Sequence, residues 1–199
     1  MKRSITNLLL MIAVPLVCMV SNLPAQNDDL PVYLKGAVPV EDGKVVFRES
    51  FSVPDISRDS LMNLTREWIN GRENQEEERS SRMLIFDDEK GSVVGGCREK
   101  LVFRSALLLL DQADINYYVH ATCTPGAVDM AIIRIRYDYD DDERYTAEEI
   151  IADEVSLDKD GQKILKSSEK WRMKTIDFTK NLFRDYRNFL FRKTQKGTE

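Results

Sequence analysis

Residues 115–142 read INYYVHATCT PGAVD MAIIRIRYDYDDD and carry the strongest structural signal in the chain. Two long alternating runs flank a five-residue turn that contains Pro125 and Gly126, which predicts a β-hairpin over residues 114–142. Side chains of a strand point alternately to its two faces, so each run has one face for a core and one for water. The expected core set is Ile115, Tyr117, Val119, Ala121 and Cys123 in the first run, and Ala131, Ile133, Ile135, Tyr137 and Tyr139 in the second.

The opposite face of this hairpin is polar and holds the side chains with the clearest capacity for binding. It carries Tyr118 and His120, the only histidine, in the first run and Arg134 and Arg136 in the second. Arginine donates charge-assisted, bidentate hydrogen bonds to carboxylates and phosphates. The hypothesis is that these four residues bind a small anionic or polar ligand, and the alternative is a solvated sheet face.

The acidic end of the hairpin raises the possibility of a metal site. Asp138, Asp140, Asp142 and Glu149 fall at positions one, three, five and twelve of a calcium-binding loop. Glu143 stands at position six, where such loops need Gly, and a strand rather than a helix precedes the segment. The match is partial, and an acidic strand end is the alternative interpretation.

Other chemistries lack their residue sets. One histidine and no Gly-x-Ser-x-Gly element argue against a serine hydrolase. Residues 91–96 are glycine-rich but lack the Lys-Ser/Thr pair of a phosphate loop. No Cys/His set has the spacing of a zinc site. We therefore expect no catalytic residue and no cofactor.

The segments around the hairpin complete an α+β pattern. Residues 44–53 alternate like a strand, and Ser57 is placed to cap a helix over residues 58–70. Shorter patterns predict strands at 82–86 and 92–104, a short helix near 147–153, and a second main helix over 175–192. The order strand, helix, four strands, helix predicts a curved antiparallel β-sheet with two main helices on one face.

The N-terminus has the pattern of a signal peptide over residues 1–25. Lys2 and Arg3 precede an uncharged run over residues 8–20, which is short for a membrane span, and a small residue, Ala25, suits a cleavage site before Gln26. We expect an exported protein, periplasmic or extracellular, without stable membrane insertion after cleavage. The alternatives are an uncleaved anchor and lipidation of Cys18, which its preceding residues disfavour.

The mature chain is expected to form one domain over residues 43–193, after a flexible leader over 26–42 and before a tail over 194–199. Removing the signal leaves 27 basic and 34 acidic side chains, a net charge of −7, which argues against nucleic acid as a partner. Cys97 and Cys123 are too few for a disulfide scaffold, so buried free thiols are expected, with an oxidised pair as the alternative.

Two groups of residues resemble a known family. The first is Gly43-Lys44-Val45-Val46-Phe47, followed by Val53-Pro54 and by a helix with Glu67-Trp68. The second is Tyr145-Thr146-Ala147-Glu148-Glu149, Asp153-Glu154 and Lys174-Thr175-Ile176-Asp177. Together they resemble an exported bacterial domain-of-unknown-function family with a TATA-binding-protein-like (TBP-like) fold. The resemblance implies a helix-on-curved-sheet fold and export, and it implies no activity, cofactor or catalytic residue.

These observations favour a non-enzymatic binding or interaction module. An open sheet face or a sheet edge would engage an unknown protein, peptide or glycan partner. The alternative is a small metal-dependent or ligand-processing enzyme with its site at the acidic end of the hairpin. A deep pocket that joins His120 to Asp138 would favour the enzyme.

Overall fold

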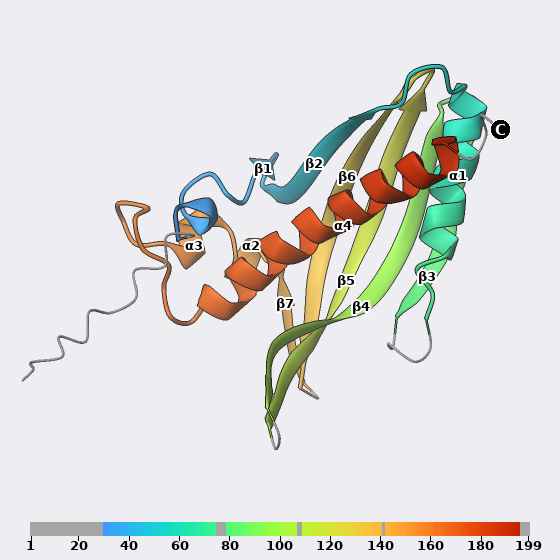
Figure 1. Cartoon of the computed structure of the whole chain (residues 1–199). Coiled ribbons are helices and arrows are strands. Elements are labelled where there is room, and N and C mark those ends of the chain that lie inside the picture. Colours follow the sequence, from blue (N-terminus) through green and yellow to red (C-terminus); the bar gives the residue numbers. More distant parts are fainter. Residues whose placement is uncertain (1–29, 75–78, 107–108, 141, 196–199) are drawn as a thin grey trace, which may run out of the picture.

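The computed structural model describes residues 30–74, 79–106, 109–140 and 142–195 (Figure 1). The elements follow the chain as η1 (Leu30–Tyr33), β1 (Val40–Glu41), β2 (Lys44–Ser52), α1 (Arg58–Asn70), β3 (Ser80–Asp87), β4 (Ser92–Ala106), β5 (Leu109–Thr124), β6 (Ala127–Tyr139), β7 (Glu143–Thr146), α2 (Ala147–Ile150), α3 (Asp153–Ser156) and α4 (Glu169–Gln195). The predicted signal peptide, its cleavage site and Cys18 lie outside the described residues.

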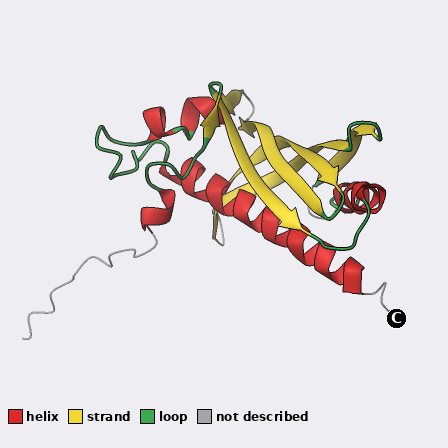
Figure 2. Cartoon of the chain, turned by 90° about the horizontal axis from the view of Figure 1, so that it is seen from above, coloured by secondary structure: helices red, strands yellow, loops and turns green. Residues whose placement is uncertain are grey.

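A seven-stranded antiparallel sheet forms the body of the described chain. Its strands lie in the order β1-β2-β6-β5-β4-β3, and β7 pairs with the far end of β6. The long helix α4 runs obliquely across the sheet, and α1 packs over β3, β4 and β5 (Figures 1 and 2). The predicted α+β fold, an antiparallel sheet with two main helices on one face, is confirmed.

Helix α1 forms where the sequence predicted it. Ser57 precedes the helix, and its Oγ accepts a hydrogen bond from the backbone N of Ser60 at 3.2 Å, which satisfies one of the unpaired amides of the first turn. Its apolar stripe, which includes Leu61, Trp68 and Ile69, is buried against the sheet. Burial of this stripe fixes which face of the sheet becomes the core.

The 114–142 hairpin is confirmed, with a tighter turn than expected. Thr124 pairs with Ala127, so Pro125 and Gly126 alone connect the two strands. Gly126 has φ 77°, a conformation that glycine adopts without the steric cost of a side chain.

A β-bulge at Arg134 corrects the expected alternation along β6. Val119 pairs with Ile132, but the register shifts between Asn116 and Tyr118, and Arg134 has φ 54°. The extra residue shifts the alternation by one, so β6 residues before the bulge lie on the face opposite to the one that strict alternation predicts. The core set is therefore Val128, Met130 and Ile132 before the bulge, and Ile135 and Tyr137 after it. The prediction was right for Ile135 and Tyr137. It placed Ala131 and Ile133 on the wrong face, since they pair with His120 and Tyr118, although Ala131 is buried there.

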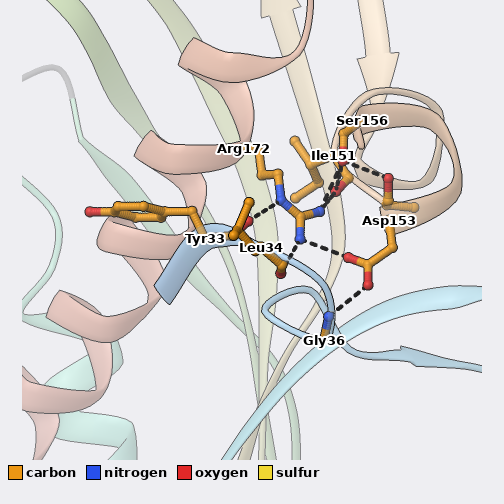
Figure 3. A network of polar contacts seen from close by, with 8 residues as sticks. Tyr33, Leu34, Gly36, Ile151, Asp153, Ser156 and Arg172 are labelled. Carbon is orange, nitrogen blue, oxygen red and sulfur yellow. Dashed lines mark hydrogen bonds and ion pairs between the residues drawn. The ribbon is translucent and has the colours of Figure 1, made fainter. Parts of the chain in front are cut away.

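The described part of the expected leader, residues 30–42, contacts the rest of the fold. The side chain of Arg172 in α4 is completely buried and donates hydrogen bonds to the backbone oxygens of Tyr33 at 2.6 Å and Leu34 at 2.8 Å (Figure 3). Asp153 accepts hydrogen bonds from both Arg172 and the backbone N of Gly36, each at 2.7 Å. These contacts hold the segment against α3 and α4, and its sequence contains no sign of them.

Helix α4 begins at Glu169, before the predicted start at residue 175. Its first turn contains Trp171, which is buried and contacts the aromatic rings of Phe103, Tyr137 and Tyr139 at centroid distances of 4.6, 5.1 and 5.3 Å. Aromatic contacts from β4 and β6 stabilise this turn, so its helicity depends on tertiary packing more than on local propensity.

Cys97 and Cys123 are both buried and unbridged, as expected. Burial raises the pKa of the Cys97 thiol to about 11, so the thiol is protonated at neutral pH. No helix among the described residues is both long enough and apolar enough to cross a membrane.

Gly95 and Gly96 on β4 allow a direct test of how closely α1 packs. A Cβ atom at Gly95 would lie 2.5 Å from Cγ2 of the fully buried Ile69, whereas one at Gly96 would meet side-chain atoms at 3.3 Å. Gly95→Ala should therefore lower the free energy of unfolding by about 1–3 kcal/mol through overpacking. Gly96→Ala is the matched control, and equal losses for both variants in urea unfolding would contradict the assignment.

Candidate functional site

A cavity of about 780 Å³ lies on the sheet face opposite α1 and α4. It is lined by residues of β3 to β7 and by Glu149 of α2. Its volume is in the range of small-ligand sites, and it is far larger than a single ion requires.

Strand register arranges the lining residues in two parallel rows. In the first row Arg82, Gly96, Tyr118 and Ile133 are successive cross-strand partners on β3, β4, β5 and β6. In the second row the partners are Ser80, Arg98, Asn116, Arg136 and Thr146. Directly opposed residues of neighbouring strands share a face, so each row forms one continuous line of side chains.

The ring of Tyr118 leans over Gly96. A Cβ atom at Gly96 would lie 3.3 Å from Cε1 of Tyr118 and 3.3 Å from Cδ1 of Leu84, so the missing side chain makes room for the ring. The guanidinium carbon of Arg134 lies 5.5 Å from the centroid of this ring, within the range of a cation–π contact. The first row is thus a flat, partly apolar surface with an arginine at its β6 end.

Arg134 occupies the point where β6 changes partners. Ile133 pairs with Val46 of β2, and Arg136 pairs with Thr146 of β7. Glu148 of α2 accepts a hydrogen bond from the backbone N of Val45 at 2.9 Å, which links α2 to β2. The left-handed backbone of Arg134 is strained for a residue with a side chain, and bulges of this kind redirect side chains.

The cavity is basic although the chain is acidic. Its lining includes five arginines, Arg82, Arg98, Arg134, Arg136 and Arg144, and two carboxylates, Asp138 and Glu149, a local charge of +3. The net charge of the whole chain is −5. Such a local concentration of positive charge attracts anions.

Two of these arginines are bound to neighbouring carboxylates. Arg98 forms an ion pair with Asp114, and Arg144 Nε lies 3.6 Å from Asp138 Oδ1. Burial acts to raise the pKa of Asp114, but hydrogen bonds from Arg98 and Lys100 outweigh it, so the pKa is lowered. The side chains of Arg82, Arg134 and Arg136 have no hydrogen-bond or ion-pair acceptor among the described residues.

The structure brings together three of the four residues that the sequence singled out for ligand binding. Tyr118, Arg134 and Arg136 all line the cavity. His120 does not line it, because it lies one row away on β5, with Nε2 3.2 Å from Oγ of Ser92. Ligand binding by these residues stays a prediction.

The four carboxylates of the calcium hypothesis have different contacts or locations in the structure. Asp138 accepts a hydrogen bond from Nδ2 of Asn116 at 2.9 Å. Glu149 caps α2 by accepting hydrogen bonds from the backbone N and Oγ1 of Thr146 at 2.8 and 2.9 Å. Asp140 lies in the turn after β6 with φ 51°, and Asp142 is exposed. Within the described ranges no group of three or more His, Cys, Asp or Glu residues could hold a metal ion.

Sequence reasoning missed Arg82, Arg98 and Arg144 as lining residues. The alternation of β4 does place Arg98 on the same face as Gly96, but the pattern within one strand does not show which strands are neighbours. Arg144 belongs to β7, a four-residue strand that the sequence did not predict. These residues meet the others through long-range strand pairing.

Comparison with known proteins agrees with the fold. The family described as "Domain of unknown function (DUF4468) with TBP-like fold" matches residues 47–138. The crystal structure of a DUF4468 family protein from Bacteroides ovatus ATCC 8483 is 36% identical, with a TM-score of 0.77 over 83% of this chain and 96% of that one. A TBP-like protein from Parabacteroides distasonis ATCC 8503 shares 21% identity, with a TM-score of 0.62 over 77% of this chain and 96% of that one.

The protein is thus an α+β protein of TBP-like fold with an open sheet face. It belongs to the DUF4468 family, whose description names a fold and no activity. No functionally curated protein matched the chain. Any function must therefore be argued from the cavity itself.

Proposed function

We propose that this protein is a non-enzymatic binding module that holds an anionic ligand in the cavity on its open sheet face. The observation that carries the proposal is the set of three arginines, Arg82, Arg134 and Arg136, which line the cavity and have no hydrogen-bond or ion-pair acceptor within the part of the chain that the structure describes. Guanidinium groups bind carboxylates and phosphates through paired, charge-assisted hydrogen bonds.

The backbone of Arg134 supports a role in binding rather than in folding. A left-handed conformation costs a residue with a side chain about 1–2 kcal/mol, and glycine adopts it freely. Arg134 nevertheless stands there, with φ 54° and its guanidinium over Tyr118. Strain of this kind is often found at functional sites, where the side chain has a use that offsets its conformational cost.

Replacing Arg134 by glycine should separate binding from stability. We expect the wild-type chain to bind citrate, a small tricarboxylate, and Arg134→Gly to weaken this binding about tenfold or more through loss of a charged donor. The same change should leave the free energy of unfolding unchanged or higher, because it relieves backbone strain. Isothermal titration calorimetry and urea unfolding measure the two quantities.

Arg48→Ala is the matched control for this experiment. Arg48 is exposed on β2, pairs with Ala131 on the same sheet face, and forms its ion pair with Glu41 outside the cavity. Its loss should leave citrate affinity unchanged. Equal citrate affinity for Arg134→Gly and the wild type would contradict the proposed function, and so would a wild-type chain that binds neither citrate nor a larger polycarboxylate.

We further propose that the module works outside the cytoplasm. Lys2, Arg3 and the uncharged run over residues 8–20 support export, and small Ala25 supports cleavage before Gln26. N-terminal sequencing of the protein isolated from the native cell envelope should therefore begin at or near Gln26. A chain that keeps Met1 and stays in the cytoplasm would rule this out.

A further inference from the structure

We infer that the ligand of this cavity is an acidic sugar chain, with a ring resting on Tyr118 and its carboxylates held by the arginines; the inference rests on the proposed function. Three features of the cavity select this chemistry. They are the spacing of the arginines, the ring of Tyr118, and the neutral and acidic groups between and beside the arginines.

The spacing of the arginines suits a ligand with more than one negative charge. In the second row Arg98 and Arg136 stand on either side of Asn116, two strand spacings or roughly 10 Å apart at Cα. In the first row Arg82 stands at the β3 end, roughly 14 Å at Cα from Ile133 on β6, and Arg134 follows Ile133 in the chain. Side chains spaced this far apart can hold two carboxylates at once, and a chain of acidic sugars carries one carboxylate per ring.

Tyr118 provides the surface for a ring. Its side chain leans over Gly96 beside Leu84, so the ring covers the sheet instead of standing away from it. An aromatic face packs well against a flat apolar surface, such as the C–H face of a pyranose. The guanidinium carbon of Arg134 lies over this ring at 5.5 Å from its centroid, so the sugar would pack on the part of the ring that Arg134 leaves uncovered, and its carboxylate would meet Arg134 there.

The remaining polar groups suit hydroxyls. Asn116 Nδ2 donates a hydrogen bond to Asp138 at 2.9 Å, and the Oδ1 of Asn116 can act as an acceptor. Asp138 and Glu149 line the β7 side of the cavity, where they can accept hydrogen bonds from hydroxyls and repel any anionic group of the ligand. Sugar hydroxyls donate hydrogen bonds and carry no charge, so they satisfy these acceptors while the carboxylates satisfy the arginines.

The test measures the affinity of the full chain for four probes by calorimetry. The probes are tri-galacturonate, the matched neutral galactose trisaccharide, citrate and adenosine monophosphate. We expect tri-galacturonate to bind at least about tenfold more tightly than citrate or the nucleotide, because it engages both arginine rows and Tyr118. We expect the neutral trisaccharide to bind at least about a hundredfold more weakly than tri-galacturonate.

Tyr118 variants separate the sugar from the charge. Tyr118→Ala should weaken tri-galacturonate binding about tenfold and weaken citrate binding much less, since it removes the ring and no charge. Tyr118→Phe keeps the ring and should behave like the wild type with both probes. Equal loss of both probes in Tyr118→Ala would overturn the stacking role of the ring.

The outcomes distinguish this inference from the proposed function. Citrate binding that is as tight as tri-galacturonate binding, or tighter binding of the nucleotide, would overturn the acidic sugar and leave an anion-binding module. Binding of the neutral trisaccharide as tightly as tri-galacturonate would overturn the role of the carboxylates. If none of the four probes binds, both proposals are overturned.

Discussion

Replacing Arg172 by methionine should lower the free energy of unfolding by about 3–5 kcal/mol, the cost of breaking a buried, hydrogen-bonded ion pair. The side chain is completely buried and donates to the backbone oxygens of Tyr33, Leu34 and Ile151, to Ser156 Oγ and to Asp153 (Figure 3). Methionine fills a similar volume but leaves these acceptors without donors. The loss therefore reports unsatisfied polar groups rather than a cavity.

Urea unfolding measures the loss of unfolding free energy, and hydrogen exchange shows which backbone amides are affected. The backbone N of Gly36, which donates to Asp153, should exchange faster in Arg172→Met, because Asp153 loses the arginine that orients it. Lys174→Met is the control, since Lys174 is exposed on the same helix. A loss below about 1 kcal/mol in Arg172→Met would show that water replaces the arginine at little cost.

Removing Arg72 should be comparably costly, at about 3–5 kcal/mol, since it leaves the buried carboxylate of Glu99 to the more distant Arg79, whose Nη1 lies 4.0 Å from its Oε2. Arg72 is 9% exposed, and its Nε and Nη2 donate to Oε1 of Glu99 at 3.0 and 2.7 Å. The Tyr117 hydroxyl donates to the same oxygen at 2.5 Å, and burial raises the pKa of this tyrosine well above its usual value. The arginine thus compensates a charge that water does not reach.

A double replacement separates the loss of the pair from the loss of one partner. Arg72→Met alone leaves Glu99 buried and charged, whereas Arg72→Met with Glu99→Leu removes both charges and fills the space. We expect the double variant to be more stable than Arg72→Met in urea unfolding, because isolated buried charge is costlier than apolar packing. A double variant that is as unstable as the single one would place the stability in packing by the arginine stem instead.

The elements that follow from local pattern were predictable. The 114–142 hairpin rests on alternation around Pro125-Gly126, and α1 rests on the Ser57 cap and its apolar stripe; both kinds of signal extend over neighbouring residues. The short strand β7 and the first turn of α4 were not predictable. They depend on partners distant in sequence, as when Trp171 contacts rings from β4 and β6.

The candidate site was predictable in part. Tyr118, Arg134 and Arg136 could be assigned to one face. Strict alternation predicts the wrong face only for β6 residues before the bulge, so it places Arg136 correctly, and Arg134 is the bulge residue itself. Strand register decides which other side chains stand beside them, and it joins Arg82, Arg98 and Arg144 to the site while it leaves His120 one row away. Single-strand patterns contain no information on register between strands.

The sequence alone determined the α+β class, the central hairpin, the first helix and the polar face with its arginines, because each depends on contacts within a few residues. The tertiary structure decided the bulge at Arg134, the gathering of five arginines around one cavity, and the burial of Arg172. A polar residue in a polar stretch looks exposed by its local pattern. Its burial depends on acceptors supplied by residues 33–34 and 151–156, which only the folded chain brings to it.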